Sequence, residues 1–152
     1  KRIRLSGGII LLKLIVLAVL LFLQFGTTWA CETNRMDLQI TNIENVRGAF
    51  FVALHDSEHT YLNDEEESFQ STIVDVVKLG TQSVSLCNIQ EGTYAIAVYQ
   101  DENSNGELDS SFLRIPKEPY GFSNNLKKML PPSFEEASFQ FVTDDVIEII
   151  LK

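Results

Sequence analysis

The residues with the clearest chemical capacity lie between positions 101 and 109, where oxygen-bearing side chains recur on alternate residues. Ca²⁺ takes about six to eight oxygen ligands at roughly 2.3–2.6 Å, and a short loop with alternating ligands can wrap around it. Gly106 stands where the backbone of such a loop must turn sharply. The pattern therefore predicts a structural calcium site. Its predicted ligands are the side chains of Asp101, Asn103, Asn105 and Asp109 and the backbone carbonyl of Glu107.

The calcium pattern lacks its usual closing ligand, because Phe112 stands where such loops carry a bidentate glutamate. Glu118 or Asn124 from the following segment would supply the missing oxygen. Without metal, the same residues are typical of a hairpin connection, since Asn, Asp and Gly tolerate left-handed backbone conformations. Oxygen donors in this register exceed what a turn requires, so we favour the cation site.

Residues 112–133 contain all four prolines, which remove backbone donors and predict a long ordered loop rather than a strand. Aromatic side chains beside amides suit a carbohydrate or protein ligand, because they combine apolar area with orienting hydrogen bonds. The alternative, favoured by the length of the loop, is a small second core beneath it. The candidate ligand surface comprises Phe112, Glu118, Tyr120, Phe122, Asn124 and Asn125.

Motifs for catalysis are sparse in this chain. There is no nucleophile elbow, phosphate-cradling glycine loop or zinc-protease signature. Carboxylates at Glu118, Glu135 and Glu136 would act as the acid–base pair of a glycosidase only at a separation of ~5–10 Å. His55 and His59 have a spacing that aligns metal ligands only on a helix, whereas His55 ends a predicted strand. We therefore expect both histidines to face solvent.

The first residues have the composition of an export signal. A basic start precedes an apolar run over residues 14–23, and small residues at Thr28 and Ala30 suit a cleavage site. Lys13 interrupts the apolar stretch, which leaves too few residues for a membrane span of ~20. We expect a removed signal peptide, with an uncleaved anchor as the alternative, and no membrane span in the mature, periplasmic or extracellular protein. The predicted organisation is a signal peptide over 1–30, a short linker over 31–35 and one domain over 36–152.

Cys31 and Cys87 are the two cysteines of the chain. Export places them where disulfides persist, so we predict a Cys31–Cys87 bridge. Closing so long a loop contributes up to ~4 kcal/mol in the chain-entropy model. The alternative is a lipid anchor on Cys31, but Thr28 occupies the position where lipoprotein signals carry an aliphatic residue.

The predicted signal peptide and the rest of the chain differ in the sign of their net charge. All 21 acidic residues follow position 30, and 12 − 4 = 8 basic residues remain there, so the mature part carries 8 − 21 = −13. Phosphate contacts require a basic surface, so this balance argues against nucleic acid as a partner. It favours cation binding, because a divalent ion relieves repulsion between carboxylates.

Short alternating segments separated by turn signals recur along the mature chain, and no segment has a convincing helical period. About seven strands in this length predict an all-β fold, a single antiparallel β-sandwich with one long ordered loop. Residues 56–70 read as an exposed polar loop. The expected strands lie at 38–41, 48–55, 73–79, 83–86, 94–99, 137–141 and 147–151.

Four stretches together resemble one family: residues 91–99, 101–109, 115–125 and 131–137. They resemble the bacterial exported family called domain of unknown function 2141, over roughly residues 36–152. The resemblance implies a secreted or cell-envelope β-sandwich, similar in outline to transthyretin-like and carboxypeptidase-regulatory-like modules, and it implies no known activity. The family usually has histidine just before the oxygen-rich loop, where this chain has Gln100.

We therefore predict an exported binding or interaction module of unknown carbohydrate or protein ligand, with a structural calcium loop at 101–109. Two alternatives remain open. One is an envelope carbohydrate-active enzyme that uses carboxylates within 112–136. The other is a purely structural accessory domain whose loop binds no metal.

Overall fold

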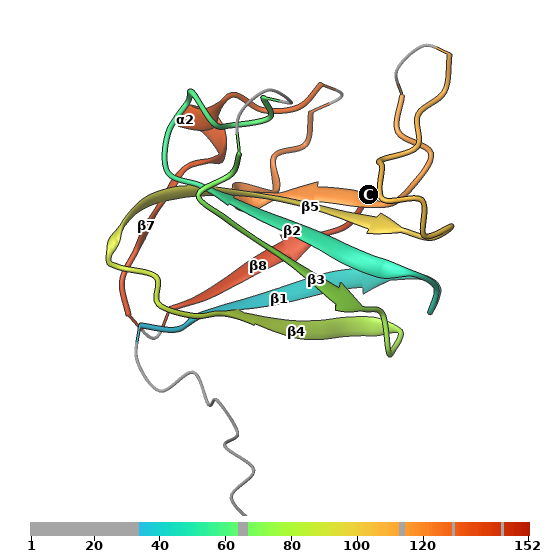
Figure 1. Ribbon diagram of the computed structural model, residues 1–152, viewed down its shortest axis with the longest axis horizontal. Helices are drawn as coiled ribbons and strands as arrows, with labels where there is room; N and C mark the ends of the chain where they lie inside the picture. The colour runs from blue at the N-terminus through green and yellow to red at the C-terminus, as the bar shows by residue number, and fades with distance from the viewer. Residues whose placement is uncertain (1–33, 64–66, 113–114, 129, 144) are drawn as a thin grey trace, which may run out of the picture. The chain divides into compact units, whose positions relative to one another are not determined.

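Two β-sheets packed face to face make up most of the described chain (Figure 1). The computed structural model describes residues 34–63, 67–112, 115–128, 130–143 and 145–152. The strands are β1 (Met36–Ile43), β2 (Ala49–His55), β3 (Gln70–Asp75), β4 (Gly80–Leu86), β5 (Gly92–Asp101), β6 (Tyr120–Phe122), β7 (Phe139–Phe141) and β8 (Val146–Ile150), and the helical turns are η1 (Ser123–Asn125) and α2 (Phe134–Ala137).

The three-stranded sheet has the order β4–β1–β8, and the five-stranded sheet has the order β3–β2–β5–β6 with β7 also paired to β5. These sheets confirm the predicted all-β sandwich. Every pair is antiparallel except β1 with β8, which run parallel. No helix in the described part of the chain has the length and apolar character needed to cross a membrane.

The core forms where the inward residues of the two sheets meet. Alternate residues of β1 (Met36, Leu38 and Ile40) are buried, and those of β2 and β5 face them from the other sheet. Each fully buried side chain of this size contributes roughly 1.5–3 kcal/mol relative to exposure. The period of two therefore commits one face of each sheet to the core and leaves the other face free.

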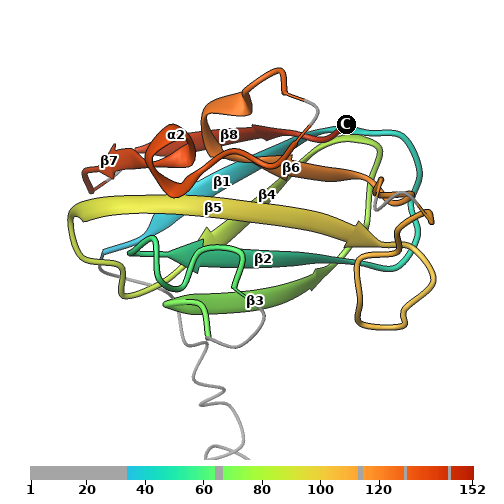
Figure 2. The ribbon, with the colours of Figure 1, turned by 90° about the horizontal axis from the view of Figure 1, so that it is seen from above.

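A seam between β6 and β8 joins the two sheets (Figure 2). A Cβ at Gly121 would lie 2.7 Å from Ile149 Cγ2 and 2.9 Å from the Ile150 carbonyl oxygen, so glycine permits this close approach. The side chain of Asn125 then occupies the edge of β8: its Oδ1 accepts from Ile150 N at 2.8 Å and its Nδ2 donates to the Glu148 carbonyl at 2.9 Å. An edge strand is thereby closed by an amide rather than by another strand.

The third strand ends earlier than the sequence predicts, at Asp75 rather than at residue 79. The side chain of Gln82 causes the difference, because it accepts from Val77 N at 2.9 Å and donates to the Asp75 carbonyl at 2.8 Å. These bonds turn the chain, so the apolar Val77 and Leu79 lie exposed in the connection instead of in a strand.

Residues 112–133 also differ from expectation, because they include the short strand β6. Pro119 precedes β6 and its carbonyl accepts from Gln100 N at 2.8 Å, so proline begins the pairing without needing a donor. The helical turn α2 was not predicted either. Ser133 and Glu136 form a capping box at its start, and the Ser-x-x-Glu spacing that marks such a box was present in the sequence.

We predict that Gly48→Ala lowers the free energy of unfolding by more than ~3 kcal/mol, because a forced backbone shift adds to the strain of a positive φ. At Gly48, φ is +61° and an added Cβ would lie 1.6 Å from the Asp101 carbonyl oxygen. Gly80→Ala is the matched control, since φ is +80° but nothing lies within 4 Å of the added Cβ. It should cost only about 1 kcal/mol. Denaturant unfolding of both variants checks this, and equal losses would contradict it.

Candidate functional site

The outer face of the five-stranded sheet carries a groove with a volume of about 840 Å³. Register across β3, β2 and β5 places small side chains in one row and large ones in the next. The row of small residues forms the floor of the groove, because its methyl and hydroxymethyl side chains rise less far above the backbone than the large side chains beside them. The small row is Ser71, Ala53 and Ala97, and the large row is Ile73, Phe51 and Tyr99.

An aromatic pair forms one wall of this groove. The rings of Phe51 and Tyr99 stack with centroids 4.9 Å apart and planes 13° from parallel. The Tyr99 hydroxyl donates to the Gly106 carbonyl at 3.1 Å, and Glu107 and Leu108 line the groove beside it. Burial raises the pKa of Tyr99, and the nearby Asp101, Glu118 and Glu107 raise it further. The 101–109 loop is thus part of the groove wall.

The opposite wall comes from the segment after β2, which contributes Leu62, Asn63 and Ser68. This segment and the one after β5 rise from opposite ends of the same sheet face (Figure 1). Tyr61 turns inward from it, and burial raises the pKa of Tyr61 to about 12. Within the described residues of the predicted exposed loop at 56–70, Tyr61 is the buried one.

His55 lies beneath this wall and lines the groove. It is only 5 % exposed, which makes the prediction of a solvent-facing side chain wrong, whereas His59 is exposed as expected. The cause is the edge-to-face contact with Tyr61, at 5.3 Å between centroids and 85° between planes. Among the described residues, no group hydrogen-bonds to His55 Nδ1. Burial lowers the pKa of His55, so a neutral ring with one donor and one acceptor is favoured.

The predicted calcium ligands come together at the end of β5. Asp101 is 2 % exposed, and its two carboxylate oxygens accept from Asn105 N at 3.2 Å and Gly106 N at 2.8 Å. The side-chain amides of Asn103 and Asn105 donate to the two oxygens of Asp109 at 2.6 and 3.2 Å. In the described part of the chain, no group of three or more His, Cys, Asp or Glu side chains is placed to hold a metal ion. Calcium binding by this mixed amide and carboxylate set stays a prediction.

Glu118 fastens both ends of the loop. Its Oε1 accepts from Glu102 N and its Oε2 from Asp109 N, each at 2.9 Å, and the side chain is 7 % exposed. A buried carboxylate with two backbone donors is a strong charge-assisted contact. Of the two predicted closing ligands, Glu118 therefore touches the loop. Asn124 instead donates to the carbonyls of Glu136 and Ser138, at 3.0 and 2.8 Å.

The three aromatic residues of the predicted ligand surface lie in different environments. Phe112 is 100 % exposed, so it takes no part in a second core. Phe122 does, because it packs against the buried Tyr61, Ala95 and Ala137. Tyr120 contacts the Phe122 ring edge-on at 5.8 Å and is paired in register with Tyr99, which extends the large row of the groove toward β6.

Of the three carboxylates proposed for catalysis within 112–136, those of Glu118 and Glu136 are engaged in structural contacts, and Glu135 is exposed. Both oxygens of Glu118 are occupied as described, and Glu136 caps α2 through Ser133 N at 3.0 Å and forms an ion pair with Lys128. The Lys128 ammonium, together with the Ser133 backbone, lowers the pKa of Glu136. These contacts assign no acid–base pair.

Sequence reasoning did not find the groove, although a signal for it was present. Large and small residues alternate along β5, and the inward positions are Tyr94, Ile96 and Val98. The small Ala95 and Ala97 therefore face outward, where a solvent-facing strand ordinarily carries polar residues. The predicted disulfide involves Cys31, which lies outside the described residues, as does the predicted signal peptide.

A comparison with protein families identifies the chain more closely. The family described as "Uncharacterized protein conserved in bacteria (DUF2141)" matches residues 38–149, which confirms the resemblance indicated by the four sequence stretches. No curated protein and no solved structure matches the chain.

We predict that Glu118→Gln loosens the 102–109 loop, because an amide NH₂ group would face one of the two backbone donors. A buried donor left without an acceptor costs about 1–3 kcal/mol. Hydrogen exchange at the amides of Glu102 and Asp109 should accelerate roughly tenfold or more, as expected for that loss. Glu107→Gln is the matched control, since Glu107 is exposed. If exchange at both amides kept its original rate in Glu118→Gln, the fastening role would be excluded.

Proposed function

We propose that this chain, which belongs to the DUF2141 family of bacterial proteins, is an exported binding module that holds a carbohydrate in its outer groove. The groove lined by Phe51, Tyr99 and His55 carries the proposal. The composition of residues 1–30, with a basic start and an apolar run, supports export.

The size and lining of the groove suit a small ligand. Binding sites for small molecules usually enclose about 300–1,000 Å³ and are mostly apolar with a few polar groups. The volume of about 840 Å³ falls in this range. The Phe51–Tyr99 pair and the alanine floor provide apolar area for the carbon faces of a sugar.

Polar groups are placed at several points around that apolar area. His55 has a ring nitrogen without a hydrogen-bond partner in the described structure, and Ser71 and Thr72 line the groove from β3. A buried polar atom without a partner is costly, and a ligand hydroxyl that reached this nitrogen would supply the missing bond. Carbohydrates combine hydroxyls with apolar carbon faces, so they match this lining better than a wholly apolar ligand does.

The proposal extends to Ca²⁺ in the 101–109 loop. Asp101, Asn103, Asn105 and Asp109 already contact one another or the loop backbone. Rotation of the two asparagine amides would turn their oxygens toward Asp109, and a cation would replace the amide donors that now neutralise it. Glu118 would hold the loop from beneath. Because Glu107 and Leu108 line the groove, a bound ion would stiffen one wall of the ligand site.

We predict that Ala97→Phe abolishes carbohydrate binding by filling the groove floor. The purified protein should bind at least one sugar on a glycan array, and calorimetry with that sugar should show at least a tenfold weaker affinity in the variant. Thr81→Phe is the matched control, since Thr81 is exposed on β4 in the other sheet, and it should bind like the parent. Absence of binding to every glycan, or equal binding by Ala97→Phe, would contradict the groove assignment.

We predict that Ca²⁺ raises the melting temperature of the parent and far less that of Asp109→Asn. At a free concentration one hundred times Kd, ligand linkage contributes about 2.7 kcal/mol. Differential scanning calorimetry with Ca²⁺ and then chelator measures the effect. Asp145→Asn is the control because Asp145 is exposed and lies outside the loop. Equal responses in the parent and Asp109→Asn would remove the calcium site and leave the groove proposal standing.

A further inference from the structure

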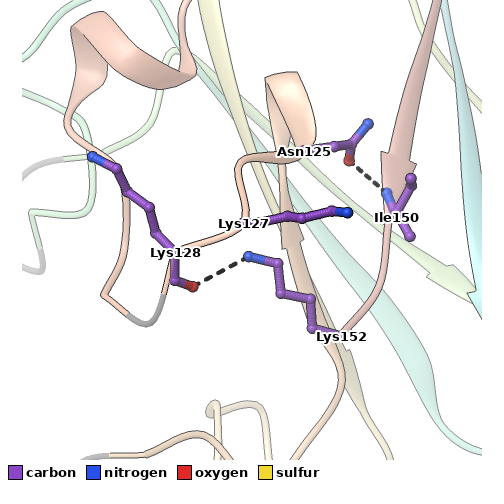
Figure 3. A pocket seen from close by; sticks show the side chains of 5 residues that line it. All are labelled: Asn125, Lys127, Lys128, Ile150 and Lys152. Carbon is purple, nitrogen blue, oxygen red and sulfur yellow. Dashed lines mark hydrogen bonds between the residues drawn. The ribbon is translucent and has the colours of Figure 1, made fainter.

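A second concave site, called the recess below, lies between the segment that leads from η1 to α2 and the end of β8. Its volume is about 390 Å³. Figure 3 shows its lining. The described residues that line it are Asn125, Lys127, Lys128, Ile150 and Lys152. None of them is acidic. It shares no lining residue with the groove on the outer face of the five-stranded sheet.

The recess has the opposite charge from the protein as a whole. Eight basic residues follow position 30, against 21 acidic ones, and three of those eight line this one site. The general acidity of the surface repels anions, so an anion would be drawn only to such a locally positive recess.

The three lysines are not equivalent. Lys128 directs its ammonium to Glu136 and only its carbonyl faces Lys152 (Figure 3). Lys152 Nζ donates to the carbonyls of Leu126 at 2.6 Å and Lys128 at 3.5 Å, and its third N–H has no acceptor among the described residues. Lys127 Nζ has no hydrogen-bond or ion-pair partner in the described part of the chain. Two uncompensated ammonium groups therefore share the recess.

The surroundings hold the Lys152 ammonium in place. The amide of Asn125 is bonded to β8 at both its oxygen and its nitrogen. Lys152 also lies 6.0 Å from the centroid of the Tyr120 ring, and its backbone N–H donates to the Tyr120 carbonyl at 2.9 Å. A positioned ammonium loses less conformational entropy on binding than a free surface lysine does.

We propose that this recess binds the phosphate group of a phosphate monoester whose attached group is apolar. A phosphate monoester carries nearly two negative charges at neutral pH, which matches the ammonium groups of Lys127 and Lys152. Lysine acts on phosphate as a point charge and needs no bidentate geometry. Ile150 and the aliphatic stems of the lysines offer apolar contact for the attached group.

The recess is separate from the carbohydrate groove and the calcium loop, and the proposed binding of phosphate requires neither of them. It also agrees with the charge argument against nucleic acid as a partner, because a recess of this size takes one phosphate group. A polyanion would have to lie along the surface of residues 31–152, whose net charge is −13.

The test is calorimetric titration of the purified protein with phenyl phosphate, followed by its mapping on backbone amide shifts in NMR spectra. We expect saturable binding with shifts concentrated at Lys127, Ile150 and Lys152. Benzoate has the same ring and one charge, and inorganic phosphate has no ring, so both should bind at least fivefold more weakly. Lys127→Gln should weaken phenyl phosphate about tenfold, the scale of one charged hydrogen bond.

Lys78→Gln is the matched control, because it removes the same charge from an exposed turn outside the recess. It should change the affinity less than twofold. Lys152→Gln should also weaken binding, and its melting temperature shows whether the loss comes from the site or from the fold. Equal weakening by Lys78→Gln and Lys127→Gln, equal affinity for benzoate, or no saturable binding at millimolar phenyl phosphate would each overturn the proposal.

Discussion

The antiparallel pairing of β2 with β5 places Ala49 opposite Asp101 at one end and His55 opposite Ala95 at the other. Side chains alternate between the faces of a strand, so this one register decides what both faces of the sheet contain. Phe50 and Val98 fall in the core, and Ala53 and the residues in its row fall outside. A slip of one residue would exchange the two sets, burying the groove floor and exposing the core. The hydrophobic core therefore specifies the groove.

Asp101 connects that pairing to the loop that follows it. Its buried carboxylate accepts two backbone donors of the loop, and the buried carboxylate of Glu118 accepts two more from the far side. A buried charge must be compensated by hydrogen bonds. Here the donors are backbone N–H groups of the loop, which have no partner in either sheet and need an acceptor of their own. The acidity of this region is thus partly structural. It gives the groove one ordered wall even though the wall contains no regular secondary structure.

Three of the eight basic residues after position 30 line one recess beside β8. Lys127 and Lys152 meet there, and none of the described residues that line the recess has an acidic side chain. Asn125 closes the edge of β8 beside the close approach at Gly121, and it also lines the recess. The seam that joins the sheets also helps to position Lys152, whose backbone N–H donates to the Tyr120 carbonyl of β6.

The sequence by itself determined the all-β class, the family, most strand positions and the clustering of Asp101 with Asp109, because these depend on alternation and on spacing within short segments. It indicated neither the burial of His55 nor the division of labour between Glu118 and Asn124, since each depends on a partner distant along the chain or on the path of a loop. The parallel β1–β8 pair and the β6–β8 seam were decided by which strands become neighbours. Periodicity shows which residues share a face of a strand; only strand order and register show what that face meets, and the groove and the recess both arise at that level.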